Sequence, residues 1–380
     1  MKEETPFVFG RIADTKNFTD RETERKRLYQ NFQSLVNTII ISPRRWGKTS
    51  LVKNVAQKVT VENKDIKICT LDIFNVKTET EFYVALAQAI LQATSSKWEE
   101  LADNAKQFLS HLLPKISFSP DAISEISFGI GWEKQTQNVD KILDLAETIA
   151  KAKNINIVVC IDEFQSVNEF ANPQAFQRKL RSHWQQHQHV SYCLYGSKRH
   201  MLLDIFSNPS MPFYKFGDIL FLEKINNAVW GKFIQKRFRD TGKEISKDDA
   251  KMLAELVENH SYYVQQLAQQ AWLRTDQICD KSIIMDAYEG VKNQLSLLFV
   301  GLIESLTNKQ IDFLKAIVSG ETALSSQEIL EKYKLGTSAN VIKIREALLS
   351  KEIIDVNAQV IDIQDPIFKI WLKTDYFKIK

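Results

Sequence analysis

The sequence predicts an α/β fold: a parallel sheet with helices on both faces, followed by two smaller domains. Three observations carry this prediction. Apolar strands alternate with helical patterns over the first 224 residues, which is typical of a parallel sheet. At about residue 225 the strand pattern stops, and only helical patterns follow to about residue 300. The remaining 80 residues combine helical patterns with two short alternating runs.

Five apolar runs predict the strands of the sheet. They are short, rich in Ile, Val and Leu, and bounded by polar residues, as expected for strands buried on both faces. The predicted strands are 37–41, 66–72, 155–161, 190–195 and 219–222. In such sheets ligands bind at the carboxyl ends of the strands, so the residues that follow these runs are candidate site residues.

The segment after the first strand has the pattern of a phosphate-binding loop. Gly47-Lys48-Thr49 follows an apolar strand and opens a helical run, so backbone N–H groups and a lysine can face a phosphate. The Thr49 hydroxyl can ligate Mg²⁺. Ser42 stands where the pattern G-x-x-x-x-G-K-[ST] has its first glycine. The predicted nucleotide-binding residues are Ser42, Pro43, Arg44, Arg45, Trp46, Gly47, Lys48, Thr49 and Ser50.

The third strand ends in two adjacent carboxylates, Asp162 and Glu163. In P-loop ATPases the first acid holds Mg²⁺ and the second can polarise the attacking water as general base. A solvated strand end could carry the same pair without function, but Lys48 and Thr49, which follow another strand of the same predicted sheet, favour the catalytic interpretation. We predict Thr49 and Asp162 as metal ligands, and Glu163 and Lys48 as catalytic residues acting on ATP.

The remaining domains are predicted from element order. Residues 225–300 form a helical lid, and residues 301–380 form a winged helix, because three helices precede a hairpin over 353–363. The core is predicted over 1–224. An insertion at about 95–140, with a helix and a β-hairpin of its own, interrupts that core.

Composition excludes several classes of protein. The chain has 380 residues and a formal net charge of +3, so no global polyelectrolyte partner is implied. Its four cysteines are widely spaced and form no Cys-x-x-Cys pair, which suits a reducing compartment. The first residues lack the apolar stretch of a signal peptide, and no run approaches the roughly 20 apolar residues of a membrane helix. We therefore expect a cytoplasmic protein without a membrane partner.

Several stretches together resemble the prokaryotic archaeal-type ATPases of the STAND and AAA+ kind. The matching stretches are 18–24, 43–51, 161–165, 196–197, 212–215, 262–267 and 365–371, and they run in order through nearly the whole chain. The resemblance implies an ASCE-type P-loop core that binds ATP and Mg²⁺ against the helical lid. It also implies a winged helix that senses the nucleotide state.

The resemblance further implies roles for individual residues. Ser197 would be a polar sensor near the γ-phosphate or the attacking water, the alternative being a helix N-cap. Lys215, or else Arg199, would act on a neighbour's nucleotide in a nucleotide-dependent oligomer; the alternative is that the lysine is simply solvated. Arg44 and Arg45 could each hold a phosphate or a core carboxylate. His260 could face the nucleotide, but a surface position at a helix end is expected by default.

The leading hypothesis is a Mg-ATP-binding ATPase that acts as a slow nucleotide-dependent switch, with the winged helix as a module for a protein partner. Two alternatives stay open: an ATP-gated DNA-binding transcriptional regulator, and a nucleotide-binding scaffold without hydrolysis. Residues 301–380 hold ten lysines and one arginine against eleven aspartates and glutamates, so their net charge is zero. Because DNA-reading modules normally carry a basic face, DNA is the less favoured partner.

Overall fold

The computed structural model describes residues 5–12, 17–95, 100, 136–357 and 360–379. The helix and hairpin predicted for the insertion fall largely on 96–99 and 101–135, outside the described residues. The chain divides into two compact units, which are described one at a time. The core unit comprises 21–44 and 48–222. The lid–winged-helix unit comprises 1–20, 45–47 and 223–380.

The core unit is built on a parallel five-stranded sheet of order β2-β3-β4-β1-β5. All five predicted strands are present, as β1 (Thr38–Ile41), β2 (Ile66–Asp72), β3 (Asn156–Asp162), β4 (Val190–Gly196) and β5 (Asp218–Phe221). Ile41 pairs with Gly196 and Ile161 with Leu194. The register therefore brings the carboxyl ends of β1, β3 and β4 together, and the residues that follow them meet at one edge.

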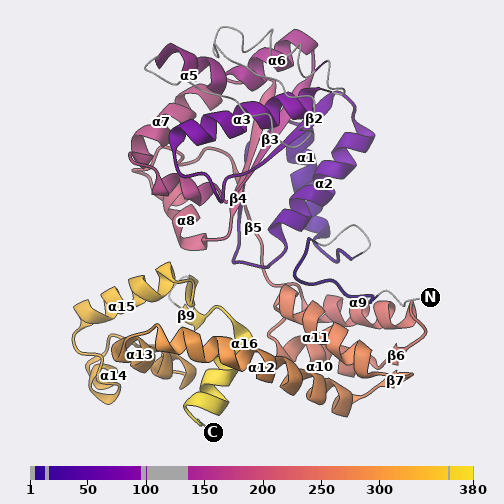
Figure 1. The fold of residues 1–380 in the computed structure, drawn as a ribbon, viewed down its shortest axis with the longest axis vertical. Helices are drawn as coiled ribbons and strands as arrows, with labels where there is room; N and C mark the ends of the chain where they lie inside the picture. The colour runs from indigo at the N-terminus through magenta and orange to yellow at the C-terminus, as the bar shows by residue number, and fades with distance from the viewer. Residues whose placement is uncertain (1–4, 13–16, 96–99, 101–135, 358–359, 380) are drawn as a thin grey trace. The chain divides into compact units, whose positions relative to one another are not determined.

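Helices cover both faces of this sheet, which confirms the predicted α/β class (Figure 1). Alternate strand residues such as Ile39, Val159 and Leu194 pack into one apolar cluster with the helices of the first face. These helices are α3 (Glu79–Thr94), α5 (Thr136–Leu143), α6 (Leu145–Lys153), α7 (Pro173–Trp184) and α8 (Arg199–Ser207). The opposite face carries α1 and α2, which lie side by side (Figure 1). Their bounds are Glu22–Gln33 and Lys48–Glu62.

The lid–winged-helix unit begins with four helices, α9 (Asn227–Arg239), α10 (Lys247–Leu256), α11 (Ser261–Arg274) and α12 (Lys281–Glu304). A short parallel pair, β6 (Glu244–Ile245) and β7 (Ile278–Cys279), joins two of their connections. The helix α12 runs without a break across the predicted boundary at residue 300. The boundaries themselves stay predictions.

The end of this unit has the predicted winged-helix order. Three helices, α13 (Asn308–Val318), α14 (Gln327–Lys332) and α15 (Ser338–Ser350), precede the antiparallel strands β8 (Ile354–Asn357) and β9 (Val360–Ile363). The chain continues as α16 (Pro366–Trp371) and a π-helical turn over Leu372–Tyr376. One apolar cluster, from Phe7 to Leu372, joins the lid helices to the winged helix.

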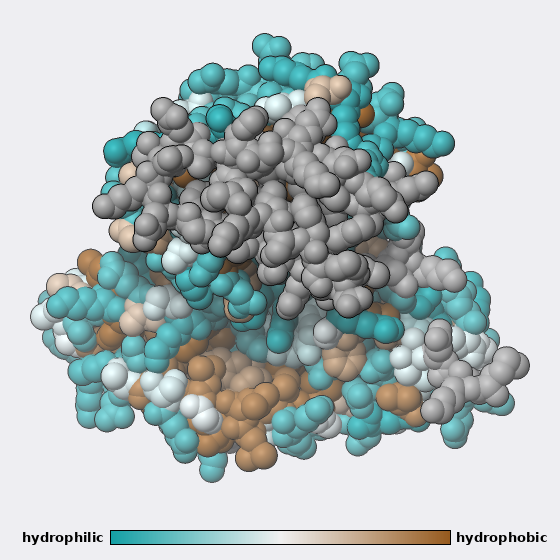
Figure 2. Space-filling view, turned by 45° about the horizontal axis from the view of Figure 1, so that its top comes forward, coloured by the Kyte–Doolittle hydropathy of each residue, from teal (hydrophilic) through white to brown (hydrophobic). Residues whose placement is uncertain are grey.

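Apolar side chains also reach the surface of this unit. Leu297 is 81% exposed and Leu298 is 68% exposed, both on α12. Figure 2 shows hydrophobic residues gathered on one face of this unit. In the described part of the chain, no helix is long and apolar enough to cross a membrane. All four cysteines are free and buried, as expected of Cys160 and Cys193 inside strands.

Candidate functional site

Thr49 and Asp162 are in contact at the carboxyl edge of the sheet. Thr49 lies in the first turn of α2, and its hydroxyl donates to Oδ2 of Asp162 over 2.8 Å. The other oxygen of Asp162 accepts the backbone N–H of Glu163 over 2.8 Å. Asp162 is buried, so these two donors hold its carboxyl in one orientation. The two predicted metal ligands, 113 residues apart in sequence, thus form one pair.

Lys48 begins α2 directly after the loop and is also buried. Its ammonium donates to the carbonyl oxygens of Ser42 and Pro43, over 3.3 and 3.0 Å. The lysine therefore binds the first part of its own loop. A bound phosphate would have to compete with these two carbonyls for the ammonium group.

The conformation of the loop explains why Ser42 is tolerated in place of glycine. Within the loop, positive φ angles occur at Arg45 (65°) and Gly47 (90°), whereas Ser42 is not among the positive-φ residues. A side chain at residue 42 is therefore compatible with the backbone. The Ser42 hydroxyl is buried and donates to the carbonyl of Pro43 over 3.1 Å.

The other loop residues differ in their surroundings. Arg45, which groups with the lid–winged-helix unit, has its guanidinium carbon 4.4 Å from the ring centroid of Tyr262 on α11. This is a cation–π contact. It was not foreseen from the sequence, which left open a phosphate or a core carboxylate as the partner of this arginine. Arg44 is exposed, Trp46 is half-buried, and Ser50 is buried inside α2.

Glu163 follows β3 with a left-handed backbone, at φ 55°. Its Oε2 accepts hydrogen bonds from the Ser197 backbone N–H over 3.3 Å and from the Ser197 hydroxyl over 3.0 Å. It also accepts from the amide nitrogen of Gln165. Ser197 is not a helix cap, because the N-cap of α8 is Lys198. The structure thus brings the predicted sensor to the predicted general base.

The pKa of Asp162 is raised to about 6. Burial is the main cause, and the neighbouring negative charge of Glu163 adds to it. The hydrogen bond from Thr49 and the positive charge of Lys48 act in the opposite direction without cancelling the effect. Ionising this carboxyl therefore costs free energy in the nucleotide-free protein.

The donor set at this edge fits Mg²⁺. This ion prefers oxygen ligands, keeps several waters, and is usually held by one or two protein groups together with substrate phosphates. The Thr49 hydroxyl and the Asp162 carboxylate are two such groups, and Lys48, the predicted phosphate-binding lysine, directly precedes Thr49 in the chain. No group of three or more His, Cys, Asp or Glu side chains with metal-binding geometry occurs in the described part of the chain.

Two further residues were singled out from the sequence, Lys215 and His260. Lys215 is exposed, with its ammonium 5.3 Å from the ring centroid of the adjacent Tyr214. His260 stands at the N-cap position of α11 but is only 5% exposed, so the expected surface position is wrong. Burial, together with the positive charges of Lys224 and Arg45, lowers the pKa of His260 to about 4. This histidine is therefore neutral at physiological pH.

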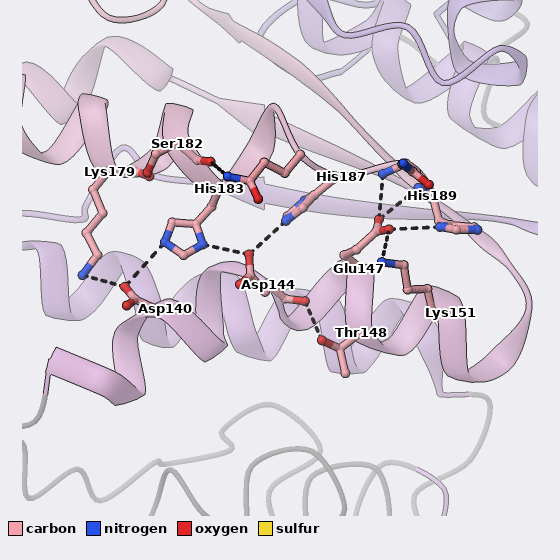
Figure 3. Close-up of polar contacts among 12 residues, drawn as sticks. Asp140, Asp144, Glu147, Thr148, Lys151, Lys179, Ser182, His183, His187 and His189 are labelled. Carbon is pink, nitrogen blue, oxygen red and sulfur yellow. Dashed lines mark hydrogen bonds and ion pairs between the residues drawn. The ribbon is translucent and has the colours of Figure 1, made fainter.

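A separate polar cluster lies between α5, α6, α7 and the start of β4 (Figure 3). Asp144 Oδ1 contacts His183 Nδ1 at 2.8 Å and His187 Nε2 at 3.1 Å. Glu147 Oε2 accepts the backbone N–H groups of Gln188 and His189 over 3.2 and 2.9 Å. These contacts fix the segment that leads from α7 into β4, which is a structural role.

Replacing Glu147 with glutamine is expected to destabilise the protein by about 3 kcal/mol at pH 7. Burial alone would raise the pKa of Glu147, but hydrogen bonds from His189, Gln188 and Lys151 outweigh it and lower the pKa to about 2. The stabilisation by the charged form is complete above about pH 4.5 and is lost as the pH falls toward 2. Urea unfolding of both proteins at pH 7 and pH 3.5 measures this.

The exposed Glu62, which pairs with Tyr29 and Lys58, provides the matched control. Glu62→Gln is expected to change stability by less than about 1 kcal/mol, as is usual for exposed pairs. An equal loss for Glu147→Gln at both pH values would contradict the assignment.

The sheet order, the Gly-Lys-Thr loop and the Asp-Glu strand end together define a P-loop NTPase, and the terminal helices and hairpin add a winged helix. Residues 46–174 match the model of the KAP family P-loop domain, and residues 297–374 match that of a probable winged helix domain. The chain is therefore a P-loop NTPase with a C-terminal winged helix, as the resemblance implied. No curated protein matches its sequence.

Solved structures share this architecture over nearly the whole chain. The Walker-type ATPase paby2304 of Pyrococcus abyssi is 17% identical, with a TM-score of 0.67, over 97% of this chain and 99% of that one. The ORC2 protein of Aeropyrum pernix, in ADPNP–ADP complexes, is 14% identical, with a TM-score of 0.57, over 95% and 94% of the two chains. At these identities the likeness shows a common fold.

Proposed function

We propose that this protein binds Mg-ATP at the phosphate loop, hydrolyses it slowly, and acts as a nucleotide-dependent switch. The hydrogen bond between Thr49 and Asp162 carries the proposal, because it joins the loop to the Asp-Glu strand end in the arrangement that a metal–phosphate site needs. The names of the two structural neighbours, a Walker-type ATPase and a protein in ADPNP–ADP complexes, point to the same nucleotide.

Each side chain of the site has a separate task in this proposal. Lys48 neutralises the β- and γ-phosphates, while Thr49 and Asp162 hold Mg²⁺, which would screen the phosphate charge. Glu163 accepts a proton from the attacking water, which displaces ADP from the γ-phosphorus. Slow turnover is supported by the contacts of Lys48 with Ser42 and Pro43, because these must break before the phosphates are bound.

The switch is supported by contacts that lead from the loop to the winged helix inside one unit. Arg45 stacks on Tyr262, and the next residue, Tyr263, donates its hydroxyl hydrogen to Asp365. Asp365 caps α16 by accepting two backbone N–H groups. A movement of Arg45 on phosphate binding would displace Tyr262, whose neighbour Tyr263 makes this partly buried hydrogen bond to the winged helix.

A second contact between the lid and the winged helix lies nearby. Lys369 of α16 bridges Glu258 at 3.0 Å and Asp362 at 2.9 Å. Glu258 also pairs with Lys224 at 3.1 Å. We propose that this junction transmits the nucleotide state to the winged helix.

We propose that the winged helix binds a protein partner, because of the character of its surface. Residues 301–380 carry no net charge, and the exposed face of α15 combines Ile342, which is 47% exposed, with Lys343 and Glu346. The exposed leucines 297 and 298 of α12 lie at the start of the same matched region. A surface that combines exposed apolar side chains with charges of both signs is typical of protein interfaces. It is poorly suited to the negatively charged phosphate backbone of DNA.

The proposal is tested by ATP binding and phosphate release in the wild type and in Lys48→Ala. The substitution is expected to weaken Mg-ATP binding at least about tenfold and to abolish measurable release, because it removes the one lysine of the phosphate loop. Calorimetry measures binding, and a colorimetric phosphate assay measures turnover. Lys53→Ala, an exposed lysine on the same helix, is the matched control and is expected to behave as the wild type.

Two outcomes of these measurements would change the proposal. Unchanged ATP affinity in Lys48→Ala would refute the proposed nucleotide site. Tight wild-type binding without phosphate release would replace the ATPase proposal with the non-hydrolysing scaffold.

A further inference from the structure

Gln165 is a buried polar residue beside the site for which the sequence predicted no role. It lies in the 3-10 turn Phe164–Glu169 that directly follows the Asp-Glu strand end, and it is 3% exposed. Its amide nitrogen donates to Oε2 of Glu163. Its amide oxygen is buried and has no hydrogen-bond partner among the described residues. An unpaired buried acceptor costs about 1–3 kcal/mol, so this side chain is not explained by stability.

The end of β4 is shaped around this amide. A Cβ atom added to Gly196 would overlap the Gln165 amide oxygen and would lie 2.9 Å from its Cδ and 3.3 Å from the Cα of Glu163. Gly196 does not have a positive φ, so its backbone conformation does not require glycine. The reason for a glycine here is therefore space: it lets Gln165 reach the carboxylate.

The donors to Glu163 converge on one of its two carboxylate oxygens. Oε2 accepts from Gln165 and, at 3.3 and 3.0 Å, from the N–H and hydroxyl groups of Ser197. These donors come from two different elements, the 3-10 turn after β3 and the residue after β4. The carboxylate is thus held from two sides, and Oε1 is the oxygen left for a water molecule.

Glu163 combines an unusual backbone conformation with a partly exposed side chain. At φ 55° and ψ 38° it lies in the left-handed region, which costs a non-glycine residue about 1 kcal/mol. The side chain is half-exposed, and a general base works only when one oxygen is aligned with the attacking water. Donors that fix Oε2 supply this alignment before the substrate arrives.

We propose that Gln165 is a positioning residue for ATP hydrolysis. Together with Ser197 it holds Oε2 of Glu163, so that Oε1 is presented to the attacking water. The inference rests on the proposed ATPase function and deepens it, because it assigns the alignment of the general base to a residue that does not itself touch the nucleotide. Gly196 takes part by leaving room for the Gln165 amide.

The test is Gln165→Met in the full-length protein. Methionine has a similar length but cannot donate to Glu163, and it removes the unpaired buried oxygen. We expect kcat to fall at least about tenfold, while KM for Mg-ATP stays within about twofold and the melting temperature does not fall. A merely structural role would give the reverse pattern, with a lower melting temperature and little effect on kcat.

The chain offers a matched control in Gln177. This glutamine of α7 is also fully buried, also has an amide oxygen without a partner among the described residues, and donates to Asn168 over 2.7 Å instead of to Glu163. Gln177→Met is therefore expected to retain the wild-type kcat. A second variant, Gly196→Ala, displaces the Gln165 amide without changing it and is expected to lower kcat to a similar extent.

A double-mutant cycle with Glu163→Gln completes the experiment. If Gln165 acts through Glu163, adding Gln165→Met to Glu163→Gln lowers the residual turnover no further. A wild-type kcat in Gln165→Met, beside a large loss in Glu163→Gln, would overturn this inference and leave the ATPase proposal intact. Absence of phosphate release from the wild type would overturn both.

Discussion

Replacing Glu163 with glutamine is expected to lower ATP turnover at least about 100-fold and to leave Mg-ATP binding unchanged. A glutamine has nearly the same shape, and its carbonyl oxygen can still accept from Ser197 and Gln165. It cannot accept a proton from water, so only the chemical step is lost. Phosphate release under saturating ATP, together with calorimetric titration of Mg-ATP, measures the two effects separately.

Glu169 provides the matched control for this substitution. It lies in the same 3-10 turn but is 42% exposed and pairs with Lys77 and Lys198 on the surface. Glu169→Gln is expected to keep the wild-type rate. If Glu163→Gln also hydrolysed ATP at the wild-type rate, the general-base assignment would be wrong, and the proposed task of Gln165 would be wrong with it.

The same variant tests the switch. Because Glu163→Gln should retain ATP, it gives access to an ATP-bound protein that does not turn over. Hydrogen exchange at the start of α11 and at α16 is expected to differ between its ATP and ADP complexes if the contact of Tyr263 with Asp365 responds to the nucleotide. Identical exchange in the two complexes would argue against transmission through this junction.

The strands could be predicted from the sequence because of their burial. The inner strands β1, β3 and β4 are short apolar runs between polar segments, and 38–41 and 190–196 are buried at every position. The edge strands β2 and β5 are buried only in part. The helix α12 had no equally clear pattern. It carries exposed leucines at 297 and 298 and is continuous with the start of the winged helix, so composition gave no sign of its length.

The site could be predicted where a local motif defines it. Lys48, Thr49 and Asp162 belong to short patterns whose chemistry requires them to meet, and Thr49 and Asp162 do meet. Gln165 was not identified, since its contact with Glu163 depends on the 3-10 turn and on the space at Gly196. These depend on tertiary structure and leave no local pattern.

For His260 the sequence led to a wrong prediction of surface exposure. A histidine at the start of a helix is usually exposed, but this one is covered by the packing of the lid and lies near Lys224 and Arg45. Its Nδ1 has no hydrogen-bond partner in the described part of the chain. Burial of this kind comes from how helices pack on one another, which the sequence of a single helix does not specify.

Replacing Asp162 with asparagine is expected to have two large and opposite effects. Turnover should fall at least about 100-fold, because the change removes the charged group that we propose as a Mg²⁺ ligand beside Thr49. The nucleotide-free protein, however, should become more stable at pH 8, by up to about 3 kcal/mol. The second effect follows from the raised pKa of this carboxyl and is independent of any assay for ATP.

The sign of the stability effect follows from proton linkage. The pKa of Asp162 is about 6 in the folded protein and about 4 in the unfolded chain, so the folded state holds the proton more tightly. As the pH rises from about 4 to 6, the folded state must give up a proton that it binds more strongly, and stability falls. Above about pH 6 the loss of stability is complete. Asparagine does not ionise, so the Asp162→Asn protein does not undergo this loss.

Thermal unfolding of both proteins at pH 5 and pH 8 measures this effect. The gain in melting temperature for Asp162→Asn should be clearly larger at pH 8. Asp218 provides a control of opposite sign: burial raises its pKa, but hydrogen bonds from Arg27 and Asn31 outweigh this and lower it. Asp218→Asn should therefore destabilise the protein at pH 8.

A destabilised Asp162→Asn protein at pH 8 would contradict the raised pKa. It would mean that the carboxylate is stabilised in the absence of a metal ion, through contacts stronger than those from Thr49 and the Glu163 backbone. The expected gain in stability for Asp162→Asn would instead bear on how the site works. In the proposed Mg-ATP complex, a divalent cation beside Asp162 would make its negative charge favourable, so the cation would offset the cost of ionising this buried carboxyl.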